Sequence, residues 1–214
     1  MDTSFITTAL DKTIEDLGLD FYSRGAFSYA TEADVQATLL GRLRANVLFN
    51  VRTSENKIEL VHAEFPAFGA PWKGAARYDL VIWHPEFAQE AYSKWGIHMR
   101  RWPKELQEQL VYIAIEMERI HGLPWDIRQR EIFSDTAQII VDKKVRSHSD
   151  IRKILNSWCK LGYFVIFWDQ EIDRKADIKI FFQLLKNAFK KLAEENSKLH
   201  IFCICRDGNK IIFP

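Results

Sequence analysis

The chain has 214 residues and a formal net charge of +1 at neutral pH, with 30 Lys and Arg residues against 29 Asp and Glu. Hydrophobic residues make up 47% and charged residues 28%, which indicates one soluble globular domain over residues 1–214. A large basic surface is excluded, although a local positive cleft is compatible with a neutral total. No apolar run approaches the roughly 20 residues of a membrane span.

The N-terminal half predicts two helices followed by two strands. A short helix from Thr7 to Leu17, ending near Gly18, lies in a helical extension over residues 1–27. A longer helix, "TEADVQATLLGRLRANV", follows with Thr31 as its N-cap. Strand signals appear at about 57–68 and 76–83, joined by "GAPWKGA", which has the composition of a hairpin loop.

The second half mixes strands and helices. Its expected elements are a partly helical insertion at 84–109, a strand at about 110–118, the apolar run "TAQIIVDKKV", a helix from Ser149 to Cys159, the strand "GYFVIFWD", an amphipathic helix at about 176–195, and two closing strands around an Asp-Gly-Asn turn. Interleaved helices and strands predict an α/β or α+β protein with a mixed central sheet.

The N-terminus and the cysteines bear on the compartment. The first residues lack the basic n-region and apolar h-region of a signal peptide. Three cysteines are too few for a disulfide scaffold, and Cys203 and Cys205 are expected to be small buried residues of a strand. Reduced thiols fit a cytoplasmic protein.

Acidic residues recur on three apolar strand-like runs. Asp79 lies in "RYDLVIW", Glu116 and Glu118 in "VYIAIEMER", and Glu64 in "ELVHAEFP". A buried carboxylate costs several kcal/mol unless it is paired or bound to a metal. An exposed strand face would explain any one of these acids, but the set favours convergence on a hard divalent cation.

Side-chain periodicity assigns faces to these acids. The two-residue strand period places Asp79 with Val81 and Trp83, and places Glu116 and Glu118 on one side of their strand, where adjacent carboxylates would repel. Glu64 lies on a strand whose two faces are equally mixed. On the second helix, Glu32 falls within the apolar stripe. Glu32 either stabilises the helix dipole or reaches toward the same cation.

This order of elements resembles the PD-(D/E)XK, or restriction-endonuclease-like, nuclease superfamily over about residues 28–170. The family pattern is a helix, a three-stranded meander, a helix and a strand. The matching residues are Glu32 on the helix, Asp79 in "RYDLVI" and Glu116 in "IAIEMER". The resemblance implies a three-layer core with the sheet flanked by helices, and Mg²⁺, or Mn²⁺ in its place, as the cofactor.

One position departs from the family pattern, because Glu118 stands where the family has its catalytic lysine. A migrated lysine, Lys143 or Lys144, could replace it. Alternatively, Asp142 and Lys144 form the (D/E)-x-K themselves and Glu116 is not a ligand. In the third alternative the protein has lost catalysis.

In the catalytic alternative, the resemblance implies metal-assisted hydrolysis of phosphodiester bonds. Asp79 and Glu116 would hold Mg²⁺, Glu64 or Glu32 would complete the shell through water, and Lys144 or Lys143 would position the attacking water.

The basic segment "HMRRWPK" either contacts the phosphates and bases of DNA or RNA, or is a solvated helix face with one packed Trp. The segment "DKKVRSH" would add further phosphate contacts. For a nuclease of this kind, DNA is the expected substrate in preference to RNA. Cutting both strands with one site per chain would favour a homodimer. Two alternatives are a non-catalytic module of the same fold that binds nucleic acid or a protein, and a structural protein whose acids face water.

Overall fold

The computed structural model describes residues 4–24, 31–52, 57–67, 77–96, 106, 109–120, 150–168, 176–205 and 210–213. The helices of the described residues are α1 (Ser4–Arg24), α2 (Glu32–Ala45), the 3₁₀ turn η2 (Val47–Phe49), α3 (Pro85–Trp95), α6 (Asp150–Asn156) and α7 (Ala176–Glu195). The strands are β1 (Asn50–Arg52), β2 (Lys57–Glu59), β3 (Val61–Pro66), β4 (Arg77–Trp83), β5 (Val111–Ile120), β6 (Leu161–Trp168), β7 (Leu199–Cys205) and β8 (Lys210–Phe213).

Within the described residues, six strands form one mixed sheet in the order β3-β4-β5-β6-β7-β8. The first three strands are an antiparallel meander, β5, β6 and β7 run parallel, and β8 returns antiparallel to β7. Helix α6 lies between β5 and β6 along the chain, and helix α7 lies between β6 and β7. The predicted α/β class with a mixed sheet is confirmed.

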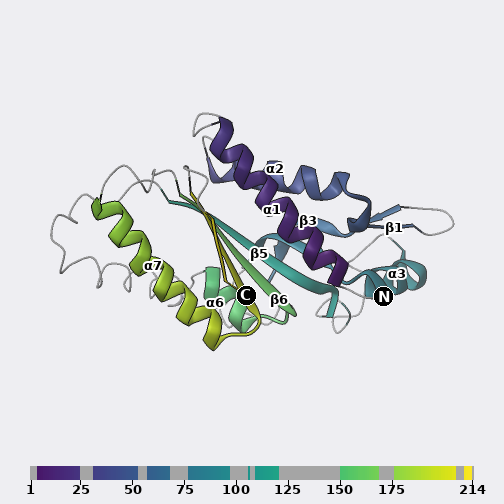
Figure 1. The fold of residues 1–214 in the computed structure, drawn as a ribbon. Helices are drawn as coiled ribbons and strands as arrows, with labels where there is room; N and C mark the ends of the chain where they lie inside the picture. Colours follow the sequence, from purple (N-terminus) through teal and green to yellow (C-terminus); the bar gives the residue numbers. More distant parts are fainter. Residues whose placement is uncertain are drawn as a thin grey trace.

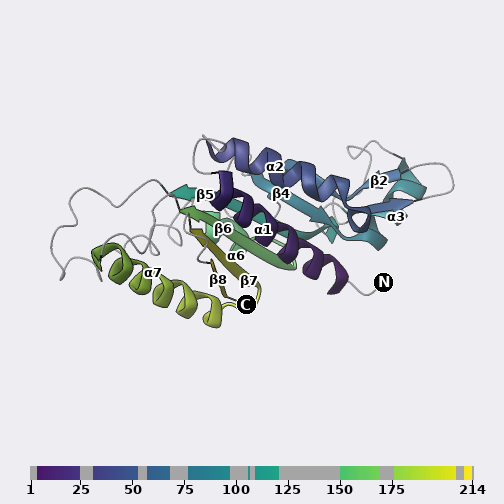
Figure 2. The same ribbon diagram turned by 45° about the horizontal axis from the view of Figure 1, so that its top comes forward.

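Helices cover both faces of this sheet (Figure 1), and the residues of β6 show which helix lies on which side. On one face, Tyr163 donates a hydrogen bond to Asp11 of α1 at 2.9 Å, and Phe167 packs edge-on against Phe21 of α1. On the other face, Gly162 meets Ile154 of α6, and Phe164 packs against Phe189 of α7. Figure 2 shows α2 beside α1 on the first face.

Helix α1 is longer than its sequence predicted. It begins at Ser4 and continues past Gly18 to Arg24, because the apolar stripe extends to Phe21, which is fully buried. A Cβ added at Gly18 would lie 2.9 Å from Ile204 Cγ2 of β7. Gly18 therefore permits close helix–sheet approach and does not end the helix.

Helix α2 begins where the sequence predicted, and its buried stripe packs over the meander. Thr31 is the N-cap, and it forms a capping box with Asp34 in which each side chain bonds to the other's backbone N–H. Val35, Leu39 and Leu43 form its buried stripe. This stripe packs α2 against β3, β4 and β5.

The predicted strand at 57–68 is divided into two. Leu60 lies between β2 and β3. Its N–H donates to the Phe49 carbonyl and its carbonyl accepts from the Trp83 N–H, so the chain passes from one sheet to the other at this residue. Strand β2 pairs with β1 in a separate two-stranded ribbon at the C-terminal end of α2 (Figure 2). Strand β1 had no counterpart in the sequence prediction.

The remaining elements bear out their sequence signals, with one shortened helix. The strands expected at 76–83, 110–118 and "GYFVIFWD", the helix at 176–195 and the two closing strands are all present. Helix α6 ends at Asn156 and not at Cys159, because Ser157 Oγ and Cys159 Sγ bond back to the Ile154 carbonyl and close the turn. The run "TAQIIVDKKV", the segment "HMRRWPK" and the loop "GAPWKGA" lie outside the described residues.

No helix among the described residues is long and apolar enough to cross a membrane.

Candidate active site

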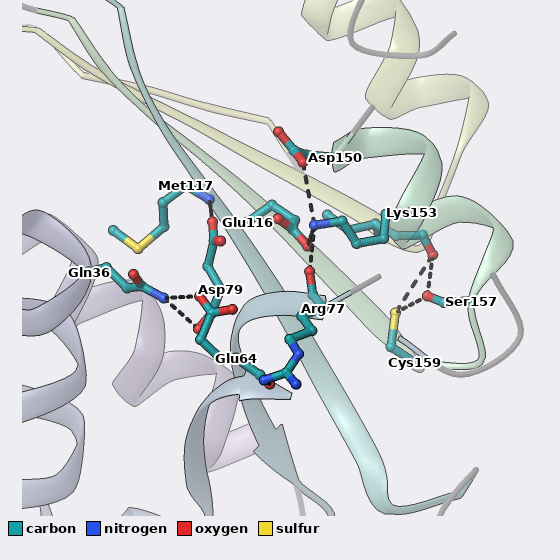
Figure 3. Close-up of polar contacts among 11 residues, drawn as sticks. Gln36, Glu64, Arg77, Asp79, Glu116, Met117, Asp150, Lys153, Ser157 and Cys159 are labelled. Carbon is teal, nitrogen blue, oxygen red and sulfur yellow. Dashed lines mark hydrogen bonds and ion pairs between the residues drawn. The ribbon is translucent and has the colours of Figure 1, made fainter. Parts of the chain in front are cut away.

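The candidate site lies where β4 and β5 separate. Their antiparallel ladder runs from Trp83 to the pair Leu80↔Ile115 and stops there. Beyond that point the carboxylate of Asp79 replaces the backbone partner, and its Oδ2 accepts a hydrogen bond from the Met117 N–H at 2.7 Å (Figure 3). Asp79 is thereby held at the fork between two strands.

The neighbouring strand β3 is irregular at the same level. Its register with β4 includes Ala63↔Leu80 and Phe65↔Tyr78 but omits the pair between them, which would join Glu64 to Asp79. Glu64 has a φ of 52°, a left-handed conformation that is uncommon outside glycine. Such strain of about 1–3 kcal/mol is typical of functional positions.

Gln36 of α2 takes over the bond that the irregular ladder leaves open. Its Nε2 donates to the Asp79 carbonyl at 2.8 Å and lies 3.5 Å from Glu64 Oε1. Gln36 therefore ties the helix on one face of the sheet to both acidic strands (Figure 3).

From the opposite face, α6 inserts Lys153 beside Glu116. Lys153 Nζ lies 2.6 Å from Glu116 Oε1, 2.6 Å from the Arg77 carbonyl and 3.4 Å from Asp150 Oδ1. The Glu116 side chain is 1% exposed and that of Lys153 is 11% exposed. An ammonium group thus lies next to a fully buried carboxylate at the fork between β4 and β5.

The position of Lys153 depends on how closely α6 packs on the sheet. A Cβ added at Gly162 of β6 would lie 1.9 Å from Ile154 Cγ2, so only glycine permits this approach. The end of α6 is held by Lys198, whose Nζ donates to the carbonyls of Leu155 and Ser157. Helix α6 is therefore fixed at its end and against the sheet.

Burial and mutual repulsion set the electrostatics of the site. Burial, followed by the charge of Asp79, raises the pKa of Glu116 well above its ordinary value, although Lys153 opposes the shift. Burial also raises the pKa of Asp79, against the Met117 hydrogen bond and the Lys153 charge. Burial by itself would lower the pKa of Lys153, but Glu116, Asp150 and Asp79 outweigh it and the pKa is raised. The lysine is a cation at neutral pH, and the two acids bind protons more strongly than usual.

The structure brings some of the predicted residues together and leaves others apart. The charge of Asp79 raises the pKa of Glu116, and the charge of Glu64 raises the pKa of Asp79. Glu118 follows Glu116 on the same face of β5 and is half-buried. Glu32 is exposed in the first turn of α2, where Gln36, one turn later, is the residue that contacts the site. Lys143 and Lys144 lie outside the described residues.

Three contributors were missed from the sequence: Lys153, Asp150 and Gln36. The signal for Lys153 was its place between Ile151 and Ile154 on the buried part of a helix, where a lysine needs a partner. The i,i+3 spacing of Asp150 and Lys153 was a second signal. Gln36 falls on the inward stripe of α2, but an amide there gives no indication of its partner.

The donor set suits a hard cation without forming a preassembled cage. Within the described ranges, no group of three or more His, Cys, Asp and Glu side chains lies close enough to hold a metal ion. The expected set of four carboxylates is therefore not gathered, and the pair Asp79 and Glu116 is what the fork provides. Mg²⁺ usually keeps several waters and takes one or two carboxylates, so this pair fits it chemically.

Comparisons of the chain with family models, with curated proteins and with solved structures found no significant match to any of them.

Proposed function

We propose that this protein is a metal-dependent nuclease that hydrolyses phosphodiester bonds of nucleic acid, with DNA preferred over RNA, through Asp79, Glu116 and Lys153. The observation that carries this proposal is the Lys153 ammonium, 2.6 Å from Glu116 and next to Asp79. Two acids and one lysine at a strand fork are the residue types that such chemistry requires.

The order of elements supports the same proposal. Helix α2, the meander β3-β4-β5, helix α6 and the parallel strand β6 follow the pattern of the PD-(D/E)XK superfamily. Asp79 is on the second strand of the meander and Glu116 on the third, where the resemblance requires them.

Lys153 would take the role of the family lysine that Glu118 does not supply. Lys153 reaches the fork from α6, the helix before β6. The sequence alternative of a migrated lysine would then hold, with Lys153 in place of the expected Lys143 or Lys144. Lys143 and Lys144 remain candidates for contacts with substrate phosphates.

Asp79 and Glu116 would hold the cation, with Glu64 and Gln36 nearby to order its water ligands. A bound Mg²⁺ would polarise the scissile phosphate and lower the pKa of a coordinated water. Because its pKa is raised, Lys153 stays protonated and would stabilise negative charge rather than abstract a proton. An ammonium has three N–H donors, and the longest of its three contacts, to Asp150 at 3.4 Å, is the one that a substrate oxygen would displace.

A non-catalytic binding module of the same fold is the second candidate. A binding module would need no lysine beside the acids. A fork that held only carboxylates would therefore have favoured this second candidate. The buried position of Lys153 favours the enzyme, because a lysine against a 1% exposed glutamate contributes little net stability, and catalysis gives the pair a role that packing does not.

The test is a cleavage assay on single-stranded and duplex DNA and on RNA, with Mg²⁺, Mn²⁺ or EDTA. The wild type is expected to cleave only with a divalent cation. Asp79→Asn and Lys153→Met should each reduce the rate about 10²–10³-fold, as does the loss of one transition-state donor. Lys191→Met removes an exposed lysine of α7 and should leave the cleavage rate unchanged. Cleavage that persists in EDTA or in Asp79→Asn would contradict the proposal, and inactivity on all three substrates would favour the binding module.

A further inference from the structure

A pocket of about 450 Å³ lies at the far end of α2 from Gln36, between the end of that helix and the β1–β2 ribbon. Its lining residues are Ala45, Val47, Asn50, Arg52 and Lys57. The volume is in the range of small-molecule sites.

Two cations lie side by side in the lining of this pocket. Arg52 of β1 and Lys57 of β2 are directly paired in the antiparallel ladder, so their side chains leave the ribbon on the same face. Both side chains are exposed, and within the described residues no carboxylate forms an ion pair with either. Like charges directly opposite each other destabilise a ribbon, and an anion between them removes this cost.

The acid nearest in the ladder is already engaged. Glu59 pairs with Asn50 across the ribbon, on the same face as Arg52, but its carboxylate lies 3.3 Å from Arg44 Nε. The pocket therefore keeps the positive charge of Arg52 and Lys57 available for a ligand.

An ordered amide and an apolar rim complete the pocket. Asn50 Nδ2 donates to the carbonyls of Arg44 and Asn46, which fixes the orientation of its amide. Val47 is 76% exposed and offers an apolar surface at the rim. A flat group with an attached anion fits both the two cations and this rim.

We propose that this pocket is a second nucleic-acid subsite, in which Arg52 and Lys57 bind a backbone phosphate and the adjoining base packs on Val47. The subsite rests on the binding of nucleic acid that the proposed function includes, because it would hold the same strand that reaches Asp79. Nine residues of α2 separate Gln36 from Ala45, about 14 Å along the helix. At about 3.4 Å per nucleotide of duplex, this corresponds to about four nucleotides.

The experiment measures binding of a fluorescein-labelled 30-mer, single-stranded and duplex, by anisotropy in EDTA, so that no cleavage is needed. Arg52→Glu should weaken binding about tenfold and lower the slope of log K against log salt by at least about one. The variant should melt at or above the wild-type temperature, because a carboxylate opposite Lys57 replaces repulsion by attraction. Lys191→Glu makes the same change of charge on α7 and should alter binding less than twofold.

The outcomes separate this inference from the proposed function. Arg52→Glu binding like the wild type, or no nucleic acid binding at all, overturns the subsite. Tight binding of deoxyadenosine monophosphate without any binding of the 30-mer also overturns it, since the pocket would then take a free nucleotide. If Arg52→Glu weakens binding but the wild type never cleaves, the subsite stands and the nuclease assignment falls.

Discussion

At the scale of single residues, the buried ion pair of Glu116 and Lys153 carries a large desolvation cost. A buried ion pair gains little net stability, because the Coulomb attraction is offset by desolvation of both charges. Glu116 is additionally repelled by Asp79. Arrangements that lower stability in this way are typical of functional sites.

Removing one partner of this pair should be strongly destabilising. Lys153→Met leaves Glu116 buried beside Asp79 without a cation, and the free energy of unfolding at pH 7.5 should fall by about 3 kcal/mol. Urea denaturation measures this value. Lys191→Met, at a side chain that is 77% exposed, should lower it by less than about 0.5 kcal/mol. Equal losses in the two variants would show that Lys153 is not buried against Glu116.

Replacing Glu116 should have an effect that depends on pH. The pKa of Glu116 is raised by burial above the ordinary value of 4.5, so between that value and the folded pKa the folded protein binds more protons than the unfolded chain. The stability of the wild type therefore falls as pH rises through this window. Glu116→Gln has no such proton, so its stability relative to wild type should improve from pH 4.5 to pH 8. Urea titrations across this range measure the difference, and a constant difference would contradict the raised pKa.

At the scale of elements, α6 is a helix of seven residues that must hold one lysine in place. So short a helix is not stable by itself and depends on tertiary packing. Gly162, the capping contacts of Ser157 and Cys159, and Lys198 supply that packing. The precision of the site therefore depends on residues that do not belong to it.

A glycine substitution at Gly162 tests this dependence, and one at Gly41 of α2, where a Cβ meets nothing, is its control. Gly162→Ala places a Cβ against Ile154 and should destabilise the protein by about 1–3 kcal/mol while displacing α6. The double variant Gly162→Ala/Ile154→Ala should lose less than the sum of the single changes. Gly41→Ala, in open space on α2, should raise stability by about 0.5–1 kcal/mol. Thermal and urea unfolding measure the wild type and the four variants, among them Ile154→Ala alone. Strict additivity in the double variant would show that the two side chains do not meet.

At the scale of the whole molecule, three layers meet at one fork in the sheet. Helix α2 brings Gln36 from one face, α6 brings Lys153 from the other, and the sheet supplies Asp79 and Glu116 between them (Figure 3). Binding of a cation there should be linked to the stability of the entire fold.

Calcium offers a test of this linkage that does not depend on hydrolysis. Millimolar Ca²⁺ should raise the melting temperature of the wild type by a few degrees at pH 8. The rise should be smaller at pH 5.5, because the raised pKa values of Glu116 and Asp79 keep both acids more protonated there. Asp79→Asn should abolish the rise. An equal rise in wild type and Asp79→Asn would place the cation elsewhere.

The sequence by itself determined the elements and the strand acids. Apolar periodicity predicted α7 and the strands β4 to β8, and the capping pattern predicted the start of α2, because these signals are local. The acids Asp79 and Glu116 stood out because a carboxylate in an apolar strand is costly to bury without a partner.

Only the tertiary structure decided which residues join those acids. Lys153 lies 37 positions after Glu116 and meets it because α6 packs on Gly162, and Gln36 meets Asp79 because Glu64 breaks the ladder. Contacts between layers are set by how closely helices approach a sheet, and no local pattern records that distance. The sequence therefore pointed to the two carboxylates of the candidate site, and the packing of three layers placed the lysine beside them.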